Sequence, residues 1–130
     1  MDLLSENLHA WLDAVGDDAL DALPFGVIGL DSQGIVSRYS SFEARMAGHM
    51  QSEVIGRHFF EEIGRCMNNG LVAKRFDDAK ARGEPLDAVL DYVFALRNEI
   101  TPVKLRMLST PDSPLRYLLV QRMAGARDAR

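Results

Sequence analysis

The chain has 130 residues, of which 47% are hydrophobic and 26% are charged, the mixture expected of one globular domain. Its net charge of −4 at pH 7 offers no basic surface for phosphates, so nucleic-acid binding is not expected. No apolar run approaches the ~20 residues of a membrane span, and the N-terminus lacks the pattern of a secretory signal. The single cysteine, Cys66, cannot form an internal disulfide and excludes a cysteine-rich zinc site. A cytoplasmic protein is therefore expected.

The N-terminal part of the chain carries two helical patterns. An apolar stripe predicts an amphipathic helix over residues 3–15, which Gly16 ends. Asp17 favours the start of a second short helical turn that runs towards Leu23. Because this stripe precedes the first predicted strand, it is expected to cover a face of the sheet. Residues 1–23 are therefore predicted to form a helical cap.

The central part begins with a predicted β-hairpin. Residues 24–30 and 35–39 read as strands, and the turn-forming residues 31–34 lie between them. Residues 40–48 favour one or two short helices, and residues 51–56 are expected to be a connector.

The rest of the chain is helical first and then extended. Residues 59–63 predict a helical turn, and residues 71–82 predict a longer amphipathic helix closed by Gly83. Three strand candidates follow, at residues 88–96, 103–108 and 115–123. Alternation in the last strand assigns Leu115, Tyr117 and Leu119 to one face and Arg116, Leu118, Val120 and Arg122 to the other. Strands at both ends with helices between them predict an α+β fold with an antiparallel sheet.

Four motifs in register then give the chain a family resemblance: LDALPFGVIGLD at residues 20–31, VIGRHFF at 54–60, TPVK at 101–104 and VQRM at 120–123. Over residues 17–123 the chain resembles the photoactive yellow protein family, bacterial blue-light receptors with a PAS fold. In that family an Ile-Gly-x-x-Phe-Phe run stands just before the cysteine that bonds the chromophore, as it does before Cys66.

The resemblance implies a five-stranded antiparallel PAS sheet with short helices on one face and an N-terminal helical cap. The implied divisions are a cap at residues 1–23, a PAS core at 24–123 and a flexible tail at 124–130. It also implies p-coumaric acid (4-hydroxycinnamate) as a covalent thioester on Cys66. Tyr39 and Glu43 occupy the positions that hydrogen-bond the phenolate. Further pocket positions fall on Phe94, Ile28, Phe59, Ala47 and His49.

The chain departs from the family pattern at several positions, among them three near the expected pocket. Arg65 stands where proline usually precedes the cysteine, Ala47 where a threonine usually supports the tyrosine, and His49 where an arginine usually covers the pocket. These changes are expected to alter the colour and recovery of a pigmented protein.

The chemistry of these residues is consistent with a photoreceptor. A thiolate is the nucleophile that forms a thioester, and the charge of Arg65 is expected to lower the pKa of Cys66 if it lies nearby. A buried phenolate needs donors; Tyr39 can donate its hydroxyl, and Glu43 can donate only while protonated. Proton transfer from Glu43 after trans–cis photoisomerisation is then expected to leave a bare carboxylate in the core and to loosen residues 3–23.

Two other classes remain open. A pigment-free PAS module can use the same sheet to bind a partner or another ligand. A cysteine-nucleophile enzyme is disfavoured, because no histidine is placed as an obvious base and no oxyanion motif stands out. A non-enzymatic sensor is therefore expected, a monomer or weak dimer that signals to a downstream protein, with no membrane or nucleic-acid partner.

Overall fold

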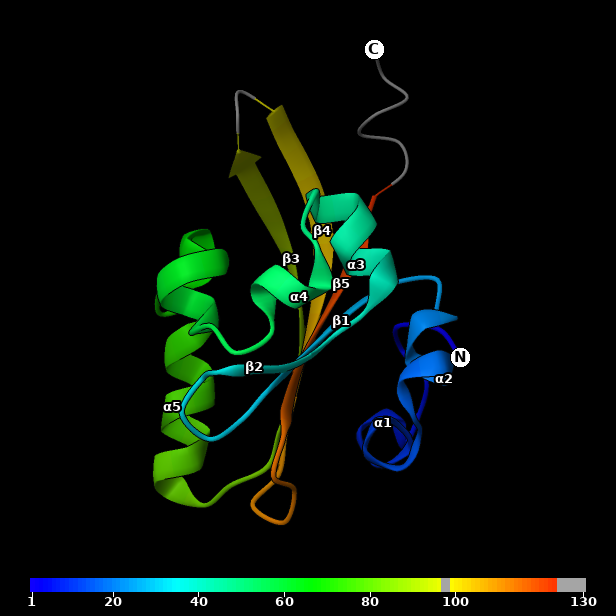
Figure 1. Ribbon diagram of the computed structural model, residues 1–130. Coiled ribbons are helices and arrows are strands. Elements are labelled where there is room, and N and C mark those ends of the chain that lie inside the picture. The colour runs from blue at the N-terminus through cyan, green and yellow to red at the C-terminus, as the bar shows by residue number, and fades with distance from the viewer. Residues whose placement is uncertain (97–98, 124–130) are drawn as a thin grey trace.

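The computed structural model describes residues 1–96 and 99–123. Five strands form one antiparallel sheet in the order β2-β1-β5-β4-β3 (Figure 1). The strands are β1 (Gly26–Leu30), β2 (Val36–Tyr39), β3 (Leu86–Leu96), β4 (Glu99–Ser109) and β5 (Arg116–Arg122). The helices are α1 (Leu8–Ala14), α2 (Asp17–Asp21), α3 (Ser41–Ala47), α4 (Gln51–Val54), η1 (Phe59–Ile63), η2 (Arg65–Met67) and α5 (Ala73–Arg82). The predicted α+β class with an antiparallel sheet and an N-terminal helical segment is confirmed.

Helices cover both faces of the sheet. Figure 1 shows α1 and α2 on one side and α5 on the other, and buried residues of α3 and α4 pack in the same cluster as those of α5. Below, the first is called the cap face and the second the site face. Tyr117 and Leu119 of β5 pack with the cap, while Leu118 and Val120 pack in the cluster on the site face. The predicted alternation of β5 is therefore correct, and the sheet separates two hydrophobic clusters.

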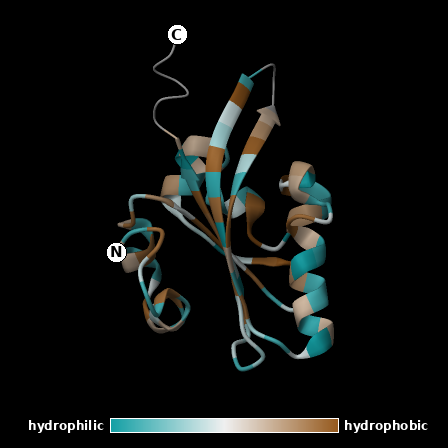
Figure 2. Cartoon of the chain, turned by 180° about the vertical axis from the view of Figure 1, so that it is seen from behind, coloured by the Kyte–Doolittle hydropathy of each residue, from teal (hydrophilic) through white to brown (hydrophobic). Residues whose placement is uncertain are grey.

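The longest helix, α5, packs on the sheet through one stripe. Phe76 and Ala79 are buried, and Figure 2 shows hydrophilic residues along the rest of the helix, with hydrophobic residues concentrated on the strands. The helix ends where Gly83 adopts a left-handed conformation with φ of 63°. No helix of residues 1–96 and 99–123 is long and apolar enough to cross a membrane.

Several local predictions differ from the structure, including the strand predicted at residues 103–108, which begins at Glu99. The helix expected over residues 3–15 begins only at Leu8, because Asn7 takes a left-handed conformation with φ of 56° and Asp2 folds the preceding residues into a turn. The connector expected at residues 51–56 contains the short helix α4. The tail expected at residues 124–130 lies outside the described residues.

Candidate functional site

Glu43 lies in the first turn of α3, and its position is fixed by a helix cap. Ser40 is the N-cap residue, and its hydroxyl accepts hydrogen bonds from the backbone N–H groups of Glu43 (3.3 Å) and Val27 (3.0 Å). Ser and Glu three positions apart often form a reciprocal capping box. Here the Ser40 N–H instead donates to the Val27 carbonyl at 2.9 Å, so the Glu43 side chain is free to turn into the core.

Buried Glu43 depends on a glycine in the neighbouring strand. A Cβ atom on Gly26 of β1 would collide with Oε1 of Glu43. The sequence therefore leaves room for this carboxylate at the edge of the site-face cluster.

The partner of Glu43 is Arg122, the last residue of β5. Nη1 and Nη2 of the guanidinium donate to Oε1 and Oε2 at 2.8 and 3.0 Å, a bidentate ion pair between two largely buried side chains. The alternation of β5 predicted the correct face for Arg122 but not this contact. The bare carboxylate expected at Glu43 concerns a pigmented protein after light-driven proton transfer; in the structure a guanidinium lies beside this carboxyl group.

Tyr39 ends β2 and faces the same cluster. Its hydroxyl is 3.1 Å from Nδ1 of the exposed His49, so these two predicted site residues are in hydrogen-bond contact. Burial, and secondarily the negative charge of Glu43, raise the pKa of Tyr39, while Arg122 opposes this effect. Tyr39 is therefore held as a neutral phenol that can donate or accept a hydrogen bond.

Cys66 lies in the short helix η2 and is exposed. Its backbone carbonyl accepts hydrogen bonds from the Tyr92 hydroxyl at 2.5 Å and from Nδ2 of Asn69 at 3.1 Å. Partial burial raises the pKa of the Cys66 thiol, and Arg65 is not among the causes. The expected lowering of this pKa is therefore wrong, because burial is the largest effect on the thiol and raises its pKa.

A line of contacts joins the carboxylate to the cysteine. The guanidinium carbon of Arg122 lies 5.8 Å from the centre of the Phe94 ring, in a cation–π contact. Phe94 packs edge-on against Tyr92 with ring centres 6.1 Å apart. Since Tyr92 bonds the Cys66 carbonyl, this line ends at the backbone of the cysteine. Arg122 and Tyr92 were both missed as site residues.

The remaining predicted positions are distributed around this line. Ile28 is paired with Tyr39 across the β1–β2 ladder, and Ile28, Phe59 and Phe94 all belong to the site-face cluster. Ala47 is half-buried at the end of α3. Packing thus brings Tyr39, Glu43, Phe94, Ile28 and Phe59 into one region, while the Cys66 side chain stands at its exposed edge.

Two cavities lie elsewhere on the molecule. One, of about 450 Å³, lies between the end of α1 and the start of β5, and the other, of about 250 Å³, lies beside Lys80 and Arg116. Within the described part of the chain, no group of three or more His, Cys, Asp or Glu side chains is arranged to hold a metal ion.

Comparison with known proteins gives the family. The model of the PAS fold matches residues 16–111. The photoactive yellow protein of Rhodothalassium salexigens is 32% identical over 84% of this chain and 86% of its own length, and that of Rhodobacter capsulatus is 34% identical over 78% and 82%.

A solved structure agrees with these relatives. The photoactive yellow protein domain of the sensor histidine kinase Ppr from Rhodospirillum centenum superposes with a TM-score of 0.78 at 34% identity, covering 86% of this chain and 97% of that domain. The chain belongs to the photoactive yellow protein family, within the PAS fold.

Proposed function

We propose that this protein is a cytoplasmic blue-light photoreceptor that carries p-coumaric acid as a thioester on Cys66. The observation that carries the proposal is the buried cluster of Tyr39, Glu43 and Arg122 at one end of a line of aromatic contacts, with a lone thiol at the other end. When bound, the hydroxycinnamate supplies visible absorption and a double bond that light isomerises.

The donor chemistry fits this group. A phenolate needs hydrogen-bond donors or positive charge when it is buried, and the Tyr39 hydroxyl and the Arg122 guanidinium can supply both. The exposed Cys66 thiol can be acylated by an activated ester: the S–C bond forms, the bond to the leaving group breaks, and the thiol proton leaves with that group.

Arg122 gives Glu43 two arrangements. Protonated, Glu43 donates a hydrogen bond to a phenolate; deprotonated, it forms the bidentate pair with Arg122. We propose that light moves the Glu43 proton to the phenolate oxygen and leaves this pair behind. The cost of the resulting carboxylate is lower than that of an unpaired charge, because Arg122 is already adjacent.

The output of this change is proposed to be loosening of the cap. Leu8, Leu12 and Leu20 of the cap pack with residues of β1, β4 and β5 in a hydrophobic cluster on the cap face. Because this cluster is separate from the site-face cluster, the cap can detach without opening the site-face cluster. A downstream signalling protein is proposed to recognise the loosened form.

A second candidate is a pigment-free PAS module. The specific observation in its favour is that Arg122 already satisfies both oxygens of Glu43 and that Tyr39 already contacts His49, so the buried polar groups need no ligand. This candidate predicts that the site takes up no pigment.

An absorption spectrum separates the two candidates. The purified protein is incubated with activated p-coumaric acid, beside a Cys66→Ala control. A visible band that bleaches in blue light, recovers in the dark and is absent from the control supports the photoreceptor. No visible band in either protein contradicts it and leaves the pigment-free module.

A further inference from the structure

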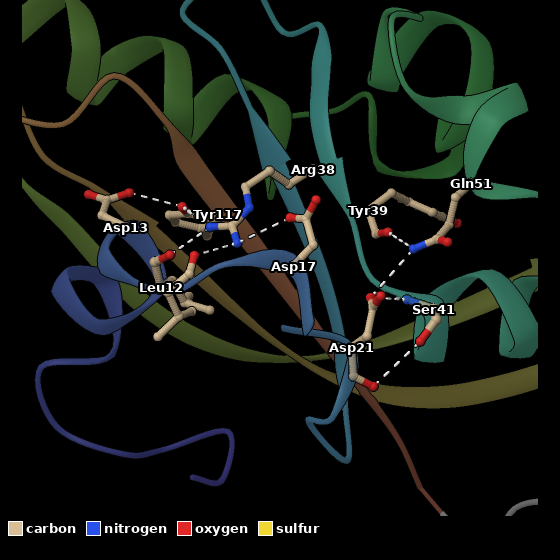
Figure 3. A network of polar contacts seen from close by, with 10 residues as sticks. Leu12, Asp13, Asp17, Asp21, Arg38, Tyr39, Ser41, Gln51 and Tyr117 are labelled. Carbon is tan, nitrogen blue, oxygen red and sulfur yellow. Dashed lines mark hydrogen bonds and ion pairs between the residues drawn. The ribbon is translucent and has the colours of Figure 1, made fainter. Parts of the chain in front are cut away.

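The cap reaches the candidate site through one carboxylate. Asp21 is the last residue of α2, and its Oδ1 accepts hydrogen bonds from the backbone N–H of Ser41 at 2.8 Å and from Nε2 of Gln51 at 3.4 Å (Figure 3). The hydroxyl of Ser41 also donates to the Asp21 carbonyl at 3.4 Å. Asp21 alone therefore makes three hydrogen bonds between the cap and the chain that follows β2.

Both partners of Asp21 are connected to site residues. Ser41 is the first residue of α3, the helix that carries Glu43, and its N–H has no acceptor within the helix. A carboxylate in this place also complements the positive end of the helix dipole. Gln51 donates to the backbone carbonyl of Tyr39 at 2.7 Å through the same Nε2 that reaches Asp21. A shift of α3 or of the end of β2 must therefore change the bonds of Asp21.

The other anchors of the cap lack this connection. Arg38 donates to the carbonyls of Leu12 at 2.6 Å and Val15 at 2.9 Å, as Figure 3 shows for Leu12. Its side chain lies on the cap face, although it precedes Tyr39 in β2, because neighbouring residues of a strand point to opposite faces. It holds the cap against the sheet without contacting a site side chain of the opposite face.

We propose that Asp21 is a positioning residue that couples the candidate site to the cap. Its role in signalling rests on the proposed photoreceptor function, but the coupling itself is a property of the protein without pigment. When Glu43 or the end of β2 changes position, the bonds of Asp21 to Ser41 and Gln51 weaken and the cap becomes easier to detach.

Amide hydrogen exchange, measured in the dark on protein without pigment, reports how firmly Asp21 holds the cap. In Asp21→Ala the amides of α1 and α2 are expected to exchange about tenfold faster, as loss of a charged hydrogen bond implies, while those of β4 and β5 keep their protection. Asp17→Ala is the matched control: Asp17 opens the same helix, its side chain is 83% exposed, and its contact with Arg38 is 3.4 Å long. That variant is expected to change exchange by about twofold or less.

A double-mutant cycle with Glu43→Gln tests the coupling. In the parent protein, Glu43→Gln breaks the pair with Arg122 and is expected to speed exchange of α1 and α2 severalfold. In Asp21→Ala it is expected to add nothing, whereas in Asp17→Ala its effect remains. A merely structural anchor gives independent effects that multiply, and that result, or no effect of Glu43→Gln on the cap, overturns the proposal.

Asp21→Asn is a milder variant for the same measurement if Asp21→Ala does not fold. The amide oxygen can still accept from Ser41, so the cap is expected to be retained in part and the effect of Glu43→Gln to be reduced but present. Full additivity in this variant also contradicts the coupling. Since pigment takes no part in these measurements, a failed reconstitution would affect the photoreceptor proposal and not this one.

Discussion

The two faces of the sheet hold similar arginines with very different partners. Arg38 and Arg106 on the cap face have side chains that are 13% and 9% exposed, and Arg122 on the site face is 12% exposed. On the cap face the guanidinium groups donate to backbone carbonyls of the N-terminal segment and to surface carboxylates: Arg106 to Leu3 and Ser5, and Arg38 to the end of α1. On the site face the partner is Glu43, only 6% exposed.

This difference bears on the proposed loosening of the cap and on the stability of the pair between Arg122 and Glu43. When the cap lifts, its carbonyls and the guanidinium groups of Arg38 and Arg106 both gain water, so the exchange of partners costs little. When the pair of Arg122 and Glu43 breaks without a new partner, a charge is left in the core. The polar contacts of the cap face are therefore consistent with the proposed detachment of the cap, whereas the buried pair on the site face resists breaking.

The largest effect is expected from removing the guanidinium on the site face. Arg122→Met leaves the Glu43 carboxylate buried without a partner, and the free energy of unfolding in urea is expected to fall by about 3 kcal/mol. Replacing both members, in Glu43→Leu with Arg122→Met, is expected to recover most of this loss, because no unpaired charge remains. A double variant as unstable as the single one would show that packing, rather than the charge, is responsible.

A smaller loss is expected when the carboxylate is displaced but kept. Gly26→Ala introduces a Cβ atom that collides with Oε1 of Glu43, so the carboxylate must move away from Arg122. The free energy of unfolding in urea is expected to fall by about 1–3 kcal/mol. The control is Gly16→Ala, where no atom lies within 4 Å of the added carbon, and which should cost far less. Equal losses in both variants would contradict the close packing of Glu43 on β1.

The smallest effect concerns the acid stability of a cap anchor. Hydrogen bonding from Arg106 lowers the pKa of Asp87 below its ordinary value of 3.8. The carboxylate is therefore favoured in the folded protein, and its contribution is present above about pH 4 and is lost as the pH falls below it. Because Asp87 is more than half exposed, the effect is small.

Fluorescence of Trp11, the single tryptophan, reports this loss because Trp11 packs against the cap cluster. The emission wavelength of Trp11 is expected to shift as the pH falls below about 4. In Asp87→Asn, the same shifted emission is expected already at neutral pH. The control is Asp91→Asn, which removes an exposed pair with Lys104. If Asp91→Asn shifts the emission as much as Asp87→Asn does, the anchor at Arg106 is not the cause.

Alternation and helical spacing predicted the architecture because each reports which side of an element is buried. They placed Arg122 with Leu118 and Val120, and the structure agrees on the site face. They could not give its partner, because Glu43 is 79 residues away and meets Arg122 only after β5 pairs with β1. A contact of this kind depends on strand order, which local patterns do not contain.

Two other wrong predictions concern local structure, the start of the first helix and the surroundings of Cys66. The first helix begins late because Asn7 is left-handed, a state open to asparagine that periodicity does not register. The pKa of Cys66 was expected to fall if the Arg65 side chain lies near the thiol, a condition that sequence proximity alone does not settle. In the structure, partial burial acts on the thiol and raises its pKa instead.

The most direct test is hydrogen exchange of the reconstituted protein in the dark and under blue light, beside Glu43→Gln. The account predicts faster exchange in α1 and α2 under illumination, unchanged protection in β4 and β5, and a much smaller light effect in Glu43→Gln. Illumination that bleaches the pigment but leaves the cap unchanged would contradict it. So would a light effect on the cap that is equally large in Glu43→Gln.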